Sequence, residues 1–203
     1  MRLPTLPKAL WLTLFSIATL FHSTLGFGQI LAKNVVTTPE VRAELLAHAP
    51  QGLPREPAQA GERPVWLGLK LTHQPHWHTY WQNPGDSGLP TTLEWTLPAG
   101  VQAGDIIWPA PQKLPVPPLV NYGYDGTVLL PVPLRFTADF KPAPGARSVE
   151  VKLKASWLAC RQECIPQEGE FALALPLDGS LAANGAAFEA ALAAVPKDLG
   201  AAA

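Results

Sequence analysis

The chain of 203 residues has little of several residue types and patterns, and each scarcity excludes a class of protein. It holds only two cysteines, so it is not one of the small secreted scaffolds that depend on many disulfides. Its 15 Lys and Arg are balanced by 16 Asp and Glu, which argues against a nucleic-acid-binding protein. No Ser–His–acid set, phosphate loop or pair of carboxylates stands out, so the sequence offers no hydrolase or nucleotide-binding signature.

Long apolar runs are also scarce, and the one present lies at the N-terminus. Residues 9–21 are apolar and uncharged, Arg2 and Lys8 flank them on the N-terminal side, and small residues follow at 23–28. This is the layout of a secretory signal peptide, and the run is too short for a comfortable membrane span. We predict that residues 1–28 are a signal peptide cleaved near 26–28, with an uncleaved anchor helix as the alternative.

The mature chain of about 175 residues is large enough for one domain with a hydrophobic core. Without Arg2 and Lys8 its balance is 13 basic against 16 acidic residues. Since no second long apolar run follows, we expect the mature chain to be soluble.

Proline is plentiful, and it limits the helices. The 23 prolines are about twice the usual ~5%, and they leave little room for long helices in the middle of the chain. Between them, apolar and polar residues alternate with the period of half-buried strands. The predicted strands cover residues 65–71, 91–97, 105–108, 127–136, 149–157 and 170–175. Pro131 and Pro133 predict that the strand at 127–136 is an edge strand or is interrupted.

Short strands separated by turns predict an all-β, immunoglobulin-like β-sandwich. The clearest turn signals lie at residues 84–88, 98–100 and 142–145. We expect a polar N-terminal extension at 29–63 with a short helix at 41–48, then the main domain at 64–178. An alanine-rich helix and tail are expected at 179–203, and no internal repeat is found.

Cys160 and Cys164 follow a strand-like run that ends at Trp157, so we expect both in the next turn, close enough for an intramolecular disulfide. A bridge over so short a loop contributes only ~2 kcal/mol by chain entropy. Short loops also tend to strain the bond and ease its reduction. Arg161 would favour a thiolate, whereas Glu163 would oppose it. A redox pair is therefore the favoured interpretation, ahead of a structural staple and of metal binding, for which two thiolates need further ligands.

His73, His76 and His78 form a second cluster that could in principle supply three metal ligands. In an extended segment His76 and His78 share one face, and His73 would need a bend at Pro75 to join them. No carboxylate that would orient such ligands lies nearby in the sequence. The favoured interpretation is three histidines with polar tips at the surface, and we expect no metal and no cofactor.

Aromatic residues gather in the segments 77–81 and 121–126, which are expected between strands. In the second segment Tyr122 and Tyr124 are flanked by Gly123 and Gly126, a pattern typical of a mobile lid with aromatic tips. Packing of both rings into the core is the alternative.

Four stretches together make the chain similar to the N-terminal periplasmic domain of the thiol:disulfide interchange protein DsbD. It resembles most closely the ScsB-like branch that is linked with copper tolerance. The stretches are WHTYWQNPGDSG at 77–88, IWPAP at 107–111, YGYDG through LLPV at 122–132, and WLAC through CIP at 157–166. The resemblance covers about residues 65–177.

This resemblance implies an immunoglobulin-like sandwich in which Cys160 and Cys164 cycle between dithiol and disulfide, as part of a periplasmic protein-disulfide reductase system. By analogy with the family, Cys164 attacks the partner disulfide and Cys160 resolves the intermediate. A cap loop that shields the cysteines would correspond to Tyr122, Gly123, Tyr124 and Asp125.

The implied partners are thioredoxin-fold redox proteins of the periplasm and a membrane electron donor, on another chain or in a missing C-terminal region. Two departures from the family pattern stand out. Only three residues separate the cysteines, which favours the ScsB-like branch, and the membrane and thioredoxin-like domains are not in this sequence. The alternative function is a non-catalytic immunoglobulin-like binding module with a structural disulfide, with copper at the histidines as one option.

Overall fold

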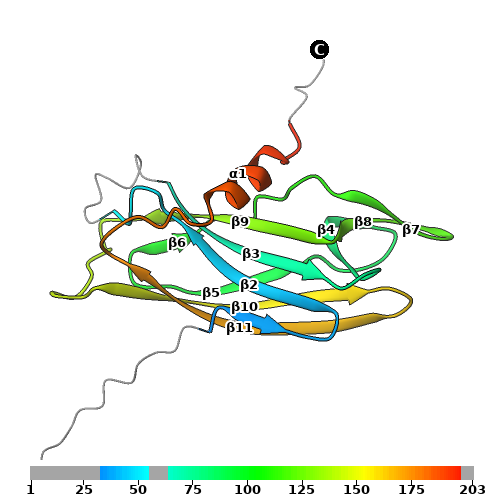
Figure 1. Ribbon diagram of the computed structural model, residues 1–203, viewed down its shortest axis with the longest axis horizontal. Coiled ribbons are helices and arrows are strands. Elements are labelled where there is room, and N and C mark those ends of the chain that lie inside the picture. Colours follow the sequence, from blue (N-terminus) through cyan, green and yellow to red (C-terminus); the bar gives the residue numbers. More distant parts are fainter. Residues whose placement is uncertain (1–32, 55–63, 198–203) are drawn as a thin grey trace, which may run out of the picture. The chain divides into compact units, whose positions relative to one another are not determined.

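The computed structural model describes residues 33–54 and 64–197, and the predicted signal peptide lies outside these residues. Within them, two antiparallel sheets face each other and one short helix covers the outside of the first sheet (Figure 1). The predicted all-β immunoglobulin-like sandwich is therefore confirmed.

The first sheet has five strands and the second has six. In spatial order the first consists of β1 (Val35–Thr37), β2 (Val41–His48), β3 (Val65–His73), β9 (Thr127–Phe136) and β6 (Val101–Ala103). The second consists of β11 (Cys164–Pro176), β10 (Ser148–Cys160), β4 (His78–Gly85), β8 (Leu119–Asp125) and β7 (Gln112–Val116), and β5 (Thr92–Thr96) also pairs with β10.

The core lies between the sheets and follows the alternation of the strands. On β10 the alternate residues Val151, Leu153, Ala155 and Trp157 are buried, and on β3 the same holds for every second residue from Val65. Each fully buried large aliphatic side chain contributes ~1.5–3 kcal/mol through removal of apolar surface from water. The predicted strands at 65–71, 91–97, 127–136, 149–157 and 170–175 are all present, as β3, β5, β9, β10 and β11.

The expectation of a helix at 41–48 is wrong, because these residues form β2. Their Ala, Leu and Glu content favours a helix locally. However, Val41, Ala43 and Leu45 are all fully buried, and the whole strand pairs in register with β3. Tertiary pairing thus overrides local propensity, and residues 35–48, which we assigned to an extension, supply two strands of the first sheet.

Residues 105–108 are not a strand, and the prolines do not place β9 at an edge. β9 runs unbroken over ten residues, with β3 on one side and the short β6 on the other. The carbonyls of Pro133 and Pro131 accept hydrogen bonds from the N–H groups of Gly104 and Ile107, at 2.9 and 2.8 Å. In an antiparallel strand the N and O atoms of one residue face the same neighbour. The missing proline N–H groups therefore face residues 104–107, where the pairing is no longer continuous.

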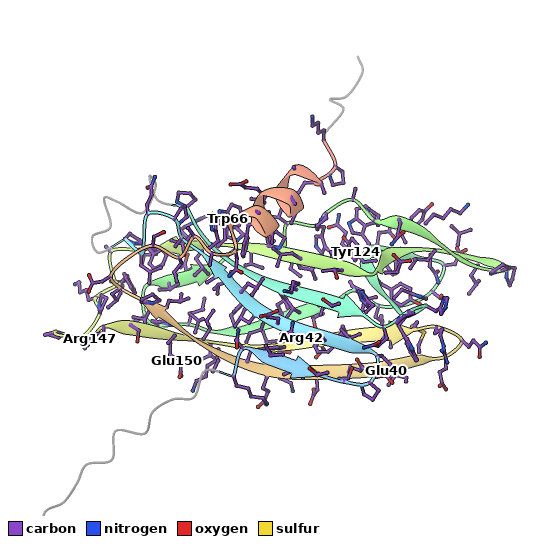
Figure 2. The ribbon with its side chains drawn as sticks, viewed as in Figure 1. Glu40, Arg42, Trp66, Tyr124, Arg147 and Glu150 are labelled. Carbon is purple, nitrogen blue, oxygen red and sulfur yellow. A yellow bond between two sulfur atoms is a disulfide. The ribbon has the colours of Figure 1, made fainter. Side chains whose placement is uncertain are left out.

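The predicted C-terminal helix is α1 (Gly185–Ala193). Its Phe188 is fully buried on the outside of the first sheet, together with Leu46 and Leu129, and Trp66 packs beside them (Figure 2). No helix in the described part of the chain is long and apolar enough to cross a membrane.

Candidate functional site

The two cysteines face each other across a hairpin. Cys160 is the last residue of β10 and Cys164 the first of β11, and a disulfide joins them with their Cα atoms 4.1 Å apart. The turn consists of residues 161–163, and the Arg161 N–H donates to the Glu163 carbonyl at 3.0 Å. The sequence placed both cysteines within the turn, whereas the structure pairs them at the two strand ends.

The two sulfur-bearing residues differ sharply in exposure. Cys160 is only 2% exposed, whereas Cys164 is exposed. A thiolate from another molecule can therefore approach the disulfide at Cys164, and attack there leaves the electron pair on Cys160. This asymmetry divides the pair into an accessible and a shielded cysteine.

The disulfide lies where β10 and β4 meet in the second sheet, which we call the seam of this sheet. Among the described residues, Cys160 and His78 form the one register pair between β10 and β4, and His78 in turn lies opposite Asp125 on β8. Residues directly opposite each other share a face of the sheet. Cys164, Cys160, His78 and Asp125 thus form a row across four strands. We call this the cysteine row, and its face is the one opposite to that of the core residues Ala159 and Trp157.

Tyr80 touches the disulfide, a role that the sequence analysis missed. It lies two residues beyond His78 on β4, and its hydroxyl donates to the Cys164 Sγ at 3.7 Å. Because β10 lies between β4 and β11, the Tyr80 side chain passes over β10 to reach that sulfur. Tyr80 is 2% exposed, and its burial raises the pKa of its hydroxyl, against a weaker lowering by Ser87. The phenol therefore stays protonated and remains a hydrogen-bond donor.

The predicted turn at residues 84–88 holds Tyr80 in place. Gly88 has a φ of +95° and lies so close to the Tyr80 ring that an added Cβ would come within 2.4 Å of it. The Ser87 N–H donates to the Asn121 side-chain oxygen at 3.0 Å, and the Asn121 amide donates back to the Ser87 hydroxyl at 2.9 Å. This turn therefore covers the Tyr80 ring, a contact that the sequence analysis did not predict.

The predicted cap loop at Tyr122, Gly123, Tyr124 and Asp125 is wrong as a loop, because these residues belong to β8. Tyr124 lies opposite Thr79, is 6% exposed and donates its hydroxyl to the Pro109 carbonyl at 2.7 Å (Figure 2). Its burial raises the pKa of the phenol. Tyr122 has the same parity and is 39% exposed. Both tyrosines thus have the strand parity opposite to that of Asp125, the member of the cysteine row on β8.

Gly123 and Asp125 share the parity of the cysteine row. Gly123 lies opposite Tyr80, where an added Cβ would come within 2.0 Å of the Thr79 carbonyl oxygen. A glycine is therefore required for β8 to approach β4 this closely. The loop prediction at residues 122–125 was wrong because glycines in a strand can mark close packing as well as a hinge.

The three histidines do not act as a group. His73 is buried, with Nδ1 2.9 Å from the Gly126 carbonyl and Nε2 3.0 Å from the Thr79 hydroxyl, and its burial lowers its pKa. His78 is buried in the cysteine row, and only His76 is exposed as expected. In the part of the chain that the structure describes, no group of three or more His, Cys, Asp or Glu is placed to hold a metal ion.

The comparisons with known proteins agree with this geometry. The family described as thiol:disulfide interchange protein DsbD, N-terminal, matches residues 49–176, which is more than half of the chain. The chain belongs to the DsbD N-terminal family. The family that four sequence stretches indicated is thus confirmed, and this DsbD-type domain carries its one close pair of cysteines at the hairpin described above.

Among solved structures, the N-terminal periplasmic domain of ScsB from Proteus mirabilis is similar in fold, with a TM-score of 0.58 and 22% sequence identity. The match covers 83% of this chain and 60% of that one, so the chain spans about three fifths of the ScsB domain structure. The GAE domain of yeast GGA1 matches with a TM-score of 0.33 and 10% identity, over 70% of this chain and 97% of that one. No curated protein sequence matches the chain.

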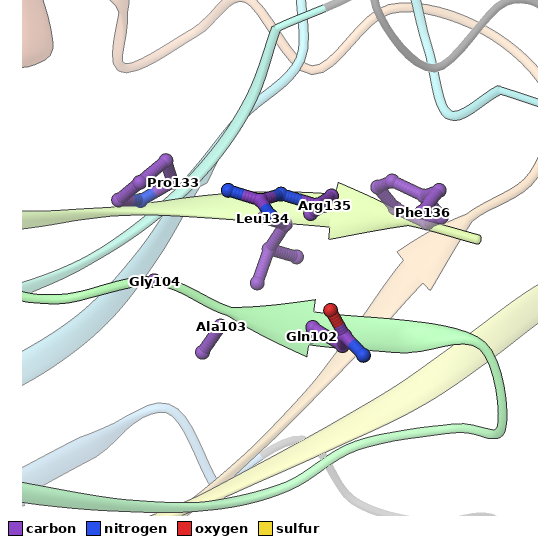
Figure 3. A pocket seen from close by; sticks show the side chains of 7 residues that line it. All are labelled: Gln102, Ala103, Gly104, Pro133, Leu134, Arg135 and Phe136. Atoms are coloured by element: carbon purple, nitrogen blue, oxygen red, sulfur yellow. The ribbon is translucent and has the colours of Figure 1, made fainter.

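Two hollows on this DsbD-type domain differ in their relation to the cysteines. One, of about 650 Å³, lies beside the cysteine hairpin and is lined by residues that include Leu89, Pro90, Leu158 and Pro166. Leu158 and Pro166 face each other one step along the same face from the disulfide. The other, of about 530 Å³, runs between β6 and β9 from Gln102 to Phe136 and contains no residue of the cysteine row (Figure 3).

Proposed function

We propose that this domain carries electron pairs by thiol–disulfide exchange through Cys160 and Cys164. The observation that supports this function best is the unequal exposure of the two cysteines in one disulfide, in a member of the DsbD N-terminal family. An exchange site needs one sulfur that partners can reach and a second that only its neighbour can reach. A structural bridge needs neither.

The position of the bridge argues against a structural staple. β10 and β11 pair in register from Ser148–Pro176 to Cys160–Cys164, so twelve further residue pairs already hold the two strands together. A disulfide that closes so short a loop restricts the unfolded chain little. The bridge is thus nearly redundant for folding.

In the reducing direction the reduced domain acts in two steps. The Cys164 thiolate attacks one sulfur of a partner disulfide, a mixed disulfide forms, and the partner's other sulfur leaves as a thiolate. The Cys160 thiolate then attacks the Cys164 Sγ, which closes the Cys160–Cys164 bond and breaks the bond to the partner. The partner gains two electrons and two protons, and the domain returns to the disulfide form.

Tyr80 assists the accessible cysteine. Its hydroxyl already donates to the Cys164 Sγ in the disulfide form. When Cys164 becomes a thiolate, this hydrogen bond gains strength, since its acceptor is then charged. Tyr80 thereby stabilises Cys164 both as attacker and as leaving group.

We propose periplasmic partners of two kinds. A thioredoxin-fold donor, supplied through a membrane domain, would reduce the domain, and exported proteins with disulfides would be reduced by it. The apolar hollow beside Cys164 offers a partner a surface next to the accessible sulfur. A signal peptide at residues 1–28 would deliver the domain to this compartment.

Trapping tests this function directly. Cys160→Ala removes the resolving thiol, so exchange should stop at the mixed disulfide and a stable adduct with a thioredoxin-fold partner should accumulate. Cys164→Ala is the matched control, because its remaining thiol is buried and should form little adduct. Adduct on Cys164→Ala alone would reverse the two roles, and no adduct on either variant would contradict electron transfer by this pair.

A further inference from the structure

The shielded cysteine poses a chemical problem that the proposed function leaves open. To resolve the mixed disulfide, Cys160 must first lose its thiol proton, because the thiolate is the nucleophile. Cys160 is only 2% exposed, so bulk water has little access to its proton. A neighbouring base would remove this barrier.

His78 occupies the position next to Cys160 on the adjacent strand. The two residues form a register pair, so their side chains leave the sheet on the same face with Cβ atoms ~4.5–5.5 Å apart. The sequence separates them by 82 positions, and only the β10–β4 pairing brings them together.

The His78 ring has a nitrogen free for this task. The side chain is 7% exposed, and its Nε2 is buried without a hydrogen-bond partner among the described residues. Buried polar atoms without a partner are rare and call for an explanation. The imidazole and the Tyr80 ring pack in a T-shaped arrangement, with the ring centroids 5.3 Å apart.

Asp125 completes the set from the next strand. It lies opposite His78 on β8, and the Gln112 side-chain amide donates to its Oδ1. Burial lowers the pKa of His78, and the charge of Asp125 opposes this lowering. The imidazole is therefore neutral near pH 7, as a base must be, and the carboxylate would stabilise the imidazolium once it forms.

We propose that His78 accepts the thiol proton of Cys160 during resolution of the mixed disulfide, and that Asp125 supports it, in a Cys160–His78–Asp125 relay. The proton moves from the Cys160 sulfur to the imidazole, and the resulting thiolate attacks the Cys164 Sγ. The partner's sulfur leaves as a thiolate and takes up a proton from the imidazolium or from water. This inference rests on the proposed exchange function and adds a third participating residue to it.

Few other charged groups lie near His78. His73 on β3 has a pKa lowered chiefly by burial, with a smaller lowering from His78 itself. Tyr80 on β4 stays neutral, since burial raises its pKa. Arg161 stacks on the ring of Trp77, the residue before His78, at 5.2 Å. Among the described residues, Asp125 is thus the one carboxylate in register with the imidazole.

Two-phase oxidation of the reduced full chain by 5,5′-dithiobis(2-nitrobenzoate) tests the relay. Attack by Cys164 releases the first coloured thiol, and resolution by Cys160 releases the second, so stopped-flow absorbance reports the two steps separately. In the unsubstituted protein the rate of the second phase should level off above the pKa of His78 and fall tenfold per pH unit below it.

His78→Gln should slow the second phase at pH 7 about 10²-fold, the low end of the ~10²–10⁴-fold that general bases contribute. Its second phase should then rise tenfold per pH unit through pH 8, while the first phase changes less than twofold. Asp125→Asn, at an exposed position, should slow the second phase severalfold without harm to the fold. His76→Asn is the matched control, because His76 is exposed and has a φ of 71°, which asparagine tolerates.

The outcomes separate this inference from the proposed function. A second phase with the same rate and pH profile in the unsubstituted protein, His78→Gln and Asp125→Asn overturns the relay and leaves exchange intact. If His78→Gln does not fold, an unchanged second phase in Asp125→Asn, together with no plateau in the unsubstituted profile, overturns it equally. Absence of any second phase in the unsubstituted protein overturns the exchange function, and the relay with it.

Discussion

Tyr80 shows how much a single hydroxyl can contribute at this site. Its ring lies over β10, its oxygen reaches Cys164 on β11, and the turn at residues 84–88 closes over it. The neighbouring tyrosines on β8 have the other parity and do not share this role. Removal of the Tyr80 hydroxyl alone therefore tests the hydrogen bond to the accessible sulfur of Cys164.

Tyr80→Phe keeps the ring and removes the hydroxyl. Loss of one hydrogen bond of ~1 kcal/mol to the thiolate should lower the thiolate fraction of Cys164 about fivefold at pH 7. Its alkylation should slow about two- to threefold, because a thiolate of higher pKa is also more nucleophilic. Iodoacetamide alkylation of the reduced protein, followed by mass spectrometry, measures this rate. Tyr122→Phe is the control and should leave the rate unchanged. An equal rate in Tyr80→Phe would show that the hydroxyl does not act on Cys164.

Strand β2 shows why the elements could be predicted only in part. Its side chains alternate less clearly than those of β10, since Leu46 and Ala47 are both buried, one outside the first sheet and one in the core. A strand that is covered on both faces loses the polar–apolar alternation that identifies β10. The segments that form β4 and β8 read as loops in the sequence, because they contain glycines and clustered aromatic residues. In the structure these residues mark close packing between the two strands.

Leu45→Ala tests whether β2 belongs to the core. Leu45 is fully buried, so this change should cost ~2–5 kcal/mol in the free energy of unfolding, measured by urea denaturation. Arg42→Ala on the same strand is the control. Arg42 is exposed and pairs with Glu44 at 2.7 Å, and such a surface pair contributes ~0–1 kcal/mol (Figure 2). Equal losses for the two variants would contradict the burial of β2.

The β10–β11 hairpin should survive reduction. Because twelve other residue pairs hold the strands, loss of the disulfide should lower the free energy of unfolding by at most ~2 kcal/mol. Thermal melts with and without a reductant measure the difference. Collapse of the fold in the reductant would mean that the bridge is a structural staple.

For the whole molecule, the sequence was sufficient for the family, the sandwich and the cysteine pair, because each depends on local pattern or motif. It could not reveal the cysteine row, whose members come from four strands. Cys160 and His78 meet only through the order β11–β10–β4–β8. Strand order depends on long-range pairing, so a site at the seam of a sheet becomes visible only in three dimensions.

The central claim is that Cys160 and Cys164 form a working redox pair. The most direct test is the midpoint potential of the pair, measured in glutathione buffers with thiol alkylation and mass spectrometry as the readout. Structural disulfides of exported proteins have potentials below ~−300 mV. We predict a potential above that value, within reach of exchange partners, whereas a value well below it would contradict the account.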